Sequence, residues 1–469
     1  MTNRTHTQGA SMGPITHAFR RPALLAAALA MFGAGCESLV EYQEKDIVTP
    51  DAVSGPSGAA ALVANARNSF TLAMNGDGDG GTEGQILISG LLSDEFFHSG
   101  TFSTRVDVDQ RATALDNGTQ SGAFRRLQAG RTDPVKALEA LATVTTITPA
   151  TDSRFGEMNN YIGAVFLTAA QNYCSGIPFS TFVAGELIAG DQLTTQQMID
   201  SAIVYFDKAL AGAAGTGNAV HNFARLQKAR ALTMVGRNRL AEAATLVAAV
   251  PTTYRSLSFH AETPTSLRNG IFVFNVQNER WAVAHRDGGN GLPFRGASAT
   301  GTDATQADPR VPWRRIAGNV GFDNTSPQYD LQIYTTRTDA SVFLKGQEAR
   351  LIEAEAKLEA GNTAGWLADL NALRATVTGL APLTDPGNAT DRVKLHFSER
   401  AFWLFATGTR VMDLRRMTRQ YSIPAETIWP TGAFFKGGSY GPDVTLPVPD
   451  IERNNPKYAG GISCINRSA

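Results

Sequence analysis

The sequence predicts a mainly α-helical protein built from antiparallel helix pairs, and its C-terminal third carries this prediction. Residues 343–360 place apolar side chains three, four and seven positions apart, as one buried face of an amphipathic helix requires. Gly361-Asn362 should end that helix, because glycine readily adopts the positive φ found at helix C-termini. A second apolar run starts at Trp366, and so short a connection makes the two helices antiparallel. A third helical run extends from Val393 to Phe405.

An internal repeat at an offset of 125 residues supports the helix-pair architecture. Small alanines where helices meet, followed by a glycine that ends the first helix, are typical of tetratricopeptide-like hairpins. Because the two copies are far apart in the sequence, we expect a helical scaffold with long insertions instead of a regular solenoid. The matching positions are Leu226, Ala229, Ala231 and Gly236 in one copy and Leu351, Ala354, Ala356 and Gly361 in the other.

Helical periodicity predicts further helices, and one long stretch interrupts them. We predict helices over 59–72, 134–144, 155–173, 195–211, 226–236 and 240–250. The interruption is a loop and strand insertion over residues 251–342, with a predicted strand at Gly270–Val276 and a second, short one at Tyr329–Tyr334. A loop of this length in a compact domain is usually functional or mobile.

The N-terminus is typical of an exported lipoprotein. Arg20-Arg21 precede a short apolar run that cannot span a bilayer, and Gly33-Ala34-Gly35-Cys36 resembles a lipobox in which Cys36 is acylated. We therefore predict a signal peptide over 1–35, a flexible tether over 36–57 and one helical domain over 58–469. Translation from Met12 in place of Met1 would give a signal of ordinary length. The alternative is a plain secretory signal with an incidental cysteine.

The other two cysteines are consistent with export. If Cys36 carries lipid, Cys174 and Cys464 remain as a candidate disulfide in an oxidising compartment. Two separate buried thiols are the alternative.

Three blocks in roughly the last 130 residues occur in a recognisable order: EARLIEAEAKLEAGN, SERAFWLFATGTRVMDLRR and LPVPDIERNNPKY. Together they resemble the SusD/RagB family of outer-membrane nutrient-binding lipoproteins. The resemblance implies a SusD-like α-superhelix of tetratricopeptide-like pairs, anchored by lipid at the outer membrane, at the cell surface. It also implies a SusC-like TonB-dependent outer-membrane barrel as partner, to which an oligomeric nutrient is delivered. We favour a glycan over a peptide as that nutrient.

The sequence patterns argue against catalysis, cofactors and nucleic acid. Gly437–Gly441 matches the G-x-S-x-G motif of serine hydrolases, but Pro442 prevents the required helix and no histidine follows His396. No histidine pair has the spacing of a zinc site, and no phosphate-binding loop is found. The 42 basic and 43 acidic residues nearly cancel. We predict a binding protein and no enzyme; a secreted lipid-anchored hydrolase and a helical scaffold for protein assembly are the alternatives.

A loop over residues 75–83 imitates part of a calcium site. Asn75, Asp77 and Asp79 alternate as in an EF-hand, but Ile86 stands at the twelfth position, where a bidentate glutamate is needed. We predict a loop without a metal ion.

Aromatic residues in loops are the candidate ligand-binding residues. A flat ring offers a sugar face a broad contact with little rotamer entropy to lose. We predict that at least two of the segments Phe97-His98, Trp281 and Trp313 lie together on one exposed surface, although for each ring taken alone core packing is the favoured interpretation. The last loop contributes Phe434, Phe435 and Tyr440.

Glu355 falls on the buried face of its helix, beside Leu351 and Ile352, and therefore needs a cationic partner. We expect an ion pair between helices. The candidate partners are Arg400, Arg410 and Arg415.

Overall fold

The computed structural model describes residues 55–183, 186–458 and 467 of the 469-residue chain. The predicted signal peptide, Cys36, most of the predicted tether and Cys464 lie outside the described residues. The first described helix begins at Gly55, within the last three residues of the stretch predicted as tether. Within the described ranges, none of the helices combines the length and the apolarity that crossing a bilayer requires.

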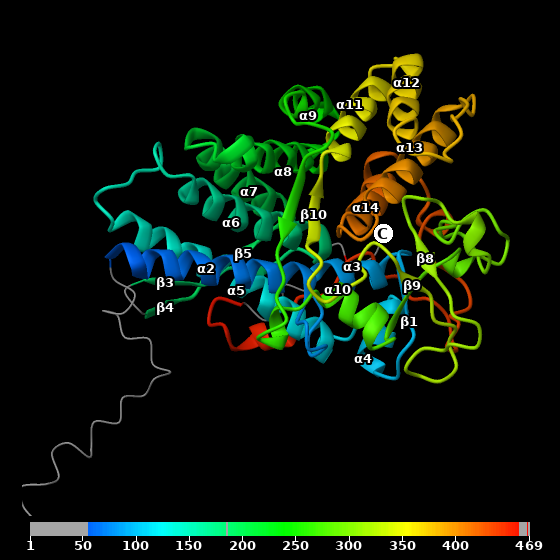
Figure 1. The fold of residues 1–469 in the computed structure, drawn as a ribbon, viewed down its shortest axis with the longest axis horizontal. Coiled ribbons are helices and arrows are strands. Elements are labelled where there is room, and N and C mark those ends of the chain that lie inside the picture. The colour runs from blue at the N-terminus through cyan, green and yellow to red at the C-terminus, as the bar shows by residue number, and fades with distance from the viewer. Residues whose placement is uncertain (1–54, 184–185, 459–466, 468–469) are drawn as a thin grey trace, which may run out of the picture. The chain divides into compact units, whose positions relative to one another are not determined.

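Helices packed in pairs make up most of the described chain, which confirms the predicted mainly α-helical, tetratricopeptide-like fold. Figure 1 shows the pairs arranged in a row from α2 to α12, and neighbours in this row contact one another. The helices are α2 (Gly55–Asn75), α3 (Gln85–Leu92), α4 (Ser103–Asp109), α5 (Gly118–Ala142), α6 (Ser153–Asn172), α7 (Thr195–Ala211), α8 (Ala219–Val235), α9 (Leu240–Val247), α10 (Gly270–Phe272), α11 (Gln347–Glu359), α12 (Thr363–Arg374), α13 (Ala389–Trp403) and α14 (Arg410–Gln420).

The two copies of the sequence repeat form neighbouring helix pairs. Between α11 and α12, Gly361 has φ +77°, and the Asn362 side chain accepts a hydrogen bond of 2.9 Å from the Gly365 N–H. These are the predicted helix stop and an N-cap for the next helix. The other copy forms α8 and α9, and α9 packs directly against α11. Helix pairs that are distant in the sequence are therefore adjacent in space.

The chain enters and leaves the long insertion through a two-stranded ribbon. Strand β6 (Arg255–Ser258) pairs antiparallel with β10 (Ser341–Lys345). The body of the insertion, which includes α10, lies beside α3 and away from α8 and α9 (Figure 1). The remaining strands form further two-stranded sheets: β1 (Phe96–His98) with β7 (Trp281–Val283), β2 (Ile177–Pro178) with β5 (Gln192–Leu193), β3 (Thr181–Val183) with β4 (Glu186–Ile188), and β8 (Trp313–Arg314) with β9 (Asp330–Leu331).

The strand predicted at Gly270–Val276 is wrong, because this segment is helical. It forms α10 followed by a π-helical turn over Val273–Gln277. The Asn269 side chain accepts a hydrogen bond of 3.1 Å from the Phe272 N–H and so caps the turn. Asn275 then bonds to the backbone of Trp281 and Leu331. A short run of buried apolar residues has no periodicity that separates strand from helix.

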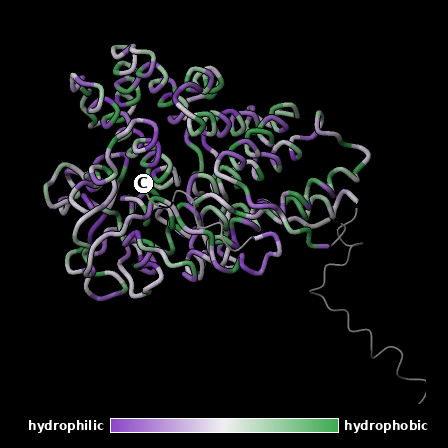
Figure 2. The backbone as a smooth tube through the Cα atoms, turned by 180° about the vertical axis from the view of Figure 1, so that it is seen from behind, coloured by the Kyte–Doolittle hydropathy of each residue, from purple (hydrophilic) through white to green (hydrophobic). Residues whose placement is uncertain are grey.

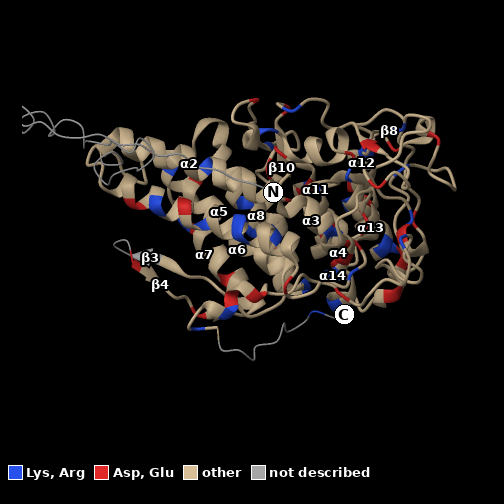
Figure 3. Cartoon of the chain, turned by 90° about the horizontal axis from the view of Figure 1, so that it is seen from below, with Lys and Arg blue, Asp and Glu red and all other residues tan. Residues whose placement is uncertain are grey.

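Apolar and polar residues alternate along the turns of the helices (Figure 2). Helices such as α2 and α7 therefore bury one face against their neighbours, as the periodicity predicts, whereas α3 is buried all round. Positions of both charge signs are interspersed along helices and loops in the view of Figure 3.

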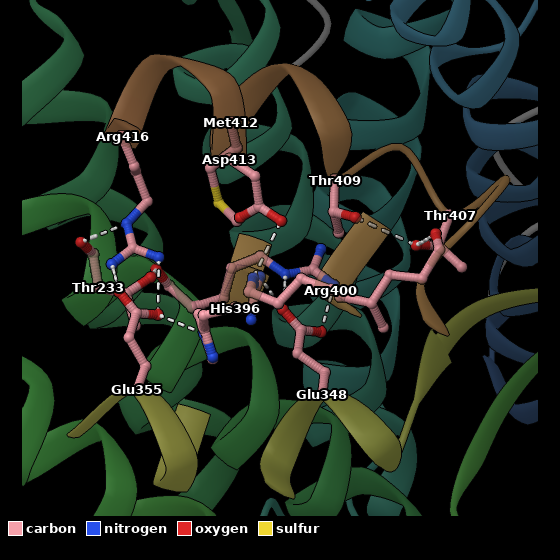
Figure 4. A network of polar contacts seen from close by, with 12 residues as sticks. Thr233, Glu348, Glu355, His396, Arg400, Thr407, Thr409, Met412, Asp413 and Arg416 are labelled. Atoms are coloured by element: carbon pink, nitrogen blue, oxygen red, sulfur yellow. Dashed lines mark hydrogen bonds and ion pairs between the residues drawn. The ribbon is translucent and has the colours of Figure 1, made fainter. Parts of the chain in front are cut away.

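A buried network of charged residues joins α8, α11, α13 and α14 (Figure 4). Glu355 pairs with Arg416 at 2.5 Å, and Arg400 pairs with Asp413 at 2.9 Å. Glu348 binds the guanidinium of Arg230 at 2.6 Å. Each helix of the group thus contributes a charge that a neighbouring helix neutralises.

The cationic partner of Glu355 differs from the three arginines that we expected. The glutamate does have a cationic partner, but it is Arg416. Arg410 instead binds Asp94, and Arg415 donates to the carbonyl of Ala170 at the end of α6. Which arginine faces α11 depends on the rotation of α14 about its own axis. The sequence does not determine this rotation, because arginines at neighbouring positions of α14 could each face α11.

Candidate functional site

A cavity of about 310 Å³ lies where four chain segments meet. Its volume falls at the lower end of the range for small-molecule sites. The segments are β1, the loop after β7, the stretch before β9 and a loop near the C-terminus. The lining residues are Phe97, Arg286, Asp287, Gly288, Arg295, Pro327, Tyr329, Ala433, Phe435 and Tyr440.

Strand β1 brings Phe97 to the cavity wall. Phe97 pairs with Ala282 of β7, while its neighbour Phe96 contacts the ring of Trp281 at 6.3 Å in the core. The His98 N–H donates a hydrogen bond of 2.7 Å to the carboxylate of Asp109. Successive side chains of a strand point to opposite faces, so Phe97 faces the cavity, whereas its neighbours Phe96 and His98 face the core.

The predicted aromatic residues are buried, which contradicts the expectation of an exposed ring surface. Trp281 and His98 are fully buried, Trp313 is 5% exposed and Phe97 is 8% exposed. Burial, with the positive charges of Lys436 and Arg105, lowers the pKa of His98 to about 3, so its ring is neutral. Trp281 and His98 belong to the core around β1 and β7, where their apolar area is removed from water.

Trp313 supports the cavity from behind. Its indole N–H donates a hydrogen bond of 3.1 Å to the carbonyl of Arg295, and its ring lies edge-on to Tyr329 at 5.4 Å. Both of these partners line the cavity. Of the four predicted site residues, Phe97 therefore lines the cavity, Trp313 holds its wall, and Trp281 and His98 lie in the core.

The loop near the C-terminus presents the most exposed ring of the site. Ala433 pairs with Ser439 across a turn in which Gly437 and Gly438 have φ of +104° and +74°. These glycines belong to the G-x-S-x-G match, which forms a turn and lacks the helix that a serine hydrolase requires. The turn holds Phe435, 49% exposed, with its ring edge-on to Phe97 at 5.3 Å.

Several contacts fix this loop to the residues that follow β1 and α4. The side chain of Gln110 donates to the Ser439 carbonyl at 2.8 Å, and Arg111 donates to the carbonyls of Pro430 and Asp443. Lys436 donates to the Gly100 carbonyl at 2.7 Å and forms an ion pair with Asp323. The ring of Phe435 is therefore held in place before any ligand arrives.

The loop after β7 lies tightly against residues 430–431. Gly288 has φ +64°, and a side chain there would place its first carbon 2.3 Å from the Thr431 nitrogen. Further along, the Leu292 N–H donates to Asp94 at 2.9 Å, and Asp94 is itself paired with Arg410 of α14. Helix α14 thus positions the loop that carries Arg286, Asp287 and Arg295.

The electrostatics of the cavity are set by buried charges. The Arg295 guanidinium lies over the Tyr329 ring, 3.5 Å from its centroid, and burial lowers its pKa to about 10. Burial and the negative charge of Asp94 raise the pKa of Asp287 to about 7. Burial, followed by the charges of Asp287 and Asp109, also raises the pKa of Tyr440. In the described part of the chain, no cluster of metal-binding side chains is found.

The arrangement of rings and polar groups suits the binding of a polyhydroxylated ligand. Rings offer flat faces, and guanidinium and carboxyl groups offer hydrogen bonds at the cavity wall. Sequence reasoning identified Phe97, Phe435 and Tyr440 but missed Arg286, Arg295 and Tyr329. A weak signal for the two missed arginines was the Gly-rich loop from Asp287 to Ala307. Arg286 directly precedes this loop, and Arg295 lies within it.

Two other cavities have different linings. One of about 260 Å³ lies beside α14, and its Arg415 and Arg416 already bind the Ala170 carbonyl and Glu355. Another, of about 410 Å³, lies between α6, α8 and β6 and contains Tyr254 and Phe259. The loop cavity combines aromatic and charged residues from four segments, and we take it as the candidate site.

Comparisons with solved structures agree on the fold. No family model and no curated protein sequence matches the chain. A SusD superfamily protein from Parabacteroides distasonis superposes with a TM-score of 0.61 at 14% identity, covering 85% of this chain and 97% of that chain. The surface glycan-binding protein A from Bacteroides uniformis gives a TM-score of 0.60 at 13% identity, covering 85% and 98%. A SusD-like carbohydrate binding protein from Bacteroides vulgatus gives 0.55 at 14% identity, covering 78% and 84%.

These likenesses extend over most of the chain. The protein has the SusD-type fold. The resemblance of the three C-terminal sequence blocks to this family is thereby confirmed at the level of the fold.

Proposed function

We propose that this protein is an outer-membrane lipoprotein that binds an oligomeric glycan and delivers it to a SusC-like TonB-dependent barrel. The fold supports this proposal, and two of the similar structures carry names that mention glycan or carbohydrate binding. The observation that carries it is the pair of rings, Phe97 and Phe435, set at 81° to one another beside the cavity. Such rings can contact two sides of a sugar.

The cavity favours binding over hydrolysis. Asp287 is the carboxyl group in its lining, whereas Asp94 is paired with Arg410 and Asp109 accepts from the His98 backbone. A glycosidase needs two carboxyl groups facing the same bond. The ligand sits among loops held by a rigid helical scaffold, a common arrangement for recognition.

The test is calorimetric titration of a panel of glycan and peptide oligomers into wild type and a Phe435→Ala variant. We expect a glycan to bind, and the variant to bind it about 10- to 100-fold more weakly, as for a contact that dominates an interface. Phe259→Ala is the matched control: that ring is also exposed, but it lines the cavity between α6, α8 and β6.

Three results would overturn the proposal. Turnover of a labelled glycan would favour the hydrolase, and a stable protein complex without any oligomer binding would favour the assembly scaffold. Loss of affinity in Phe259→Ala with none in Phe435→Ala would move the site to the other cavity.

The membrane anchor is the second part of the proposal and rests on Cys36, which lies outside the described residues. Each buried CH₂ of an acyl chain contributes about 0.8 kcal/mol to membrane binding, so several chains hold a protein firmly. Cys36→Ala should release a folded protein from the membrane fraction. Retention of that variant in membranes that lack any barrel partner would contradict acylation at Cys36.

A further inference from the structure

Two arginines in the lining of the loop cavity and a third beside its wall form no ion pair with a carboxylate of the described residues. Arg286 and Arg295 line it, and the Arg315 guanidinium lies 5.3 Å from the centroid of the Tyr329 ring in its wall. Buried arginines elsewhere have partners within the protein. Arg400, Arg410 and Arg416 are each paired with an aspartate or glutamate, and Arg111 and Arg415 donate to backbone carbonyls.

Arg295 is the most informative of the three. It is only 9% exposed, its Nη1 donates a hydrogen bond of 3.3 Å to the Val283 carbonyl, and its Nε has no partner. A buried charge with an unsatisfied donor is costly unless something binds it. Because Arg295 lines the cavity, a ligand bound there can supply the missing acceptor.

The acidic residues near the cavity do not cancel this positive charge. Asp94 is neutralised by two hydrogen bonds from Arg410. Burial raises the pKa of Asp109 well above its usual value, which favours its neutral form. Asp287 also lines the cavity, but its pKa of about 7 leaves it only partly ionised at neutral pH. The three arginines therefore exceed the ionised carboxylates around the site.

We infer that the ligand of this cavity is an acidic saccharide, whose carboxylate or sulfate group binds Arg295 and faces Arg286 and Arg315. This inference rests on the proposed function, since it names the class of glycan that the same site takes. A guanidinium presents its donors in a planar fork that matches both acid groups, which a neutral sugar cannot use as fully. The rings of Phe97 and Phe435 then contact the sugar itself.

The experiment compares oligosaccharides of equal length: an oligogalacturonate, a sulfated oligogalactan and the neutral oligogalactan. Titration calorimetry at low ionic strength should give at least tenfold tighter binding for one of the acidic probes than for the neutral one. The acidic probe that binds more tightly shows whether the site prefers a carboxylate or a sulfate group. Added salt should weaken acidic binding and leave neutral binding unchanged, because salt screens exposed charges.

Two arginine variants locate the interaction. Arg315→Gln and Arg286→Gln replace exposed side chains that form no side-chain hydrogen bond with the described residues, so both proteins should fold. Each should weaken acidic binding by about threefold or more and leave neutral binding unchanged. Arg314→Gln is the matched control, because Arg314 is the neighbour of Arg315 but is paired with Asp330 instead.

Each outcome decides the question. Equal affinity for acidic and neutral probes, abolished by Phe435→Ala, would overturn the inference and leave the proposed function standing. Acidic binding that falls with Arg314→Gln but not with the other two variants would overturn it by moving the anion elsewhere. No binding of any saccharide would overturn the proposed function as well.

Discussion

Asp287 links the charge of the cavity to pH. Burial and the charge of Asp94 raise its pKa to about 7, while Arg295 acts in the opposite direction. The carboxyl therefore gains its negative charge as pH rises from 6 to 8. The raised pKa also makes stability depend on pH. Between the ordinary pKa of an aspartate and pH 7, the native carboxyl keeps a proton that the unfolded chain has lost. The free energy of unfolding therefore falls as pH rises through this range.

We predict that the affinity for an acidic saccharide falls as pH rises from 6 to 8. Asp287→Asn should remove most of this dependence, since an amide stays neutral. The other groups near it are Asp94, Arg295, Asp109 and Tyr440. Titration calorimetry at three pH values checks this, with the neutral saccharide as control. An unchanged pH dependence in the variant would assign the effect to another group.

Buried ion pairs between helices define the arrangement of α11, α13 and α14. Glu355 lies within hydrogen-bond distance of both Arg416 and the Tyr421 hydroxyl, each at 2.5 Å. The positive charge of Arg416, with His396, holds the pKa of Glu355 well below its usual value despite burial. The carboxylate thus stays ionised in the core.

We predict that Glu355→Gln lowers the free energy of unfolding by about 3–5 kcal/mol, because it leaves the Arg416 charge buried without its partner. Glu359→Gln is the control one helical turn along α11. That glutamate pairs with Arg237 near the surface, so its loss should cost less than about 1 kcal/mol. Urea denaturation measures both. Equal effects of the two variants would mean that the buried pair contributes little.

Elements with strong local signals could be predicted from the sequence. Helix α7 has the predicted bounds, 195–211, and begins with a capping box between Thr194 and Gln197. The stop at Gly361 follows from the same local chemistry. The helical segment at 270–277 could not be predicted, because its polar groups are satisfied by distant residues such as Leu331.

The candidate site was predictable only in part for the same reason. Phe97 and Phe435 come together because β1 pairs with β7 and the C-terminal loop is anchored at Gly100 and Gln110. No local pattern encodes such a meeting of distant segments. Aromatic residue type made Phe97 a candidate, and this ring does line the cavity, but residue type did not distinguish it from the buried Trp281.

At the scale of the whole molecule, the C-terminal tail returns to the middle of the chain. The Cys174 N–H donates to the Leu446 carbonyl at 3.0 Å, and the Val444 N–H donates to the Arg467 carbonyl at 2.8 Å. Arg467 also pairs with Asp443. Cys174 is buried and disulfide-bonded. Cys464 lies outside the described residues, three positions before Arg467.

We propose Cys464 as the partner of Cys174. The bridge would close a long loop and restrict the unfolded chain by roughly 5 kcal/mol in the entropy model. Cys464→Ser should therefore lower the melting temperature under oxidising conditions and leave one alkylatable thiol at Cys174. Two free thiols in the alkylated, unreduced wild-type protein would rule the pairing out.

The whole account depends on the ligand binding in the loop cavity, and a crystal structure with the tightest-binding saccharide tests this directly. The account predicts a sugar ring in contact with Phe97 and Phe435, with its acid group at Arg295 and Tyr329 beneath that arginine. A saccharide bound instead between α6, α8 and β6, beside Tyr254 and Phe259, would contradict it.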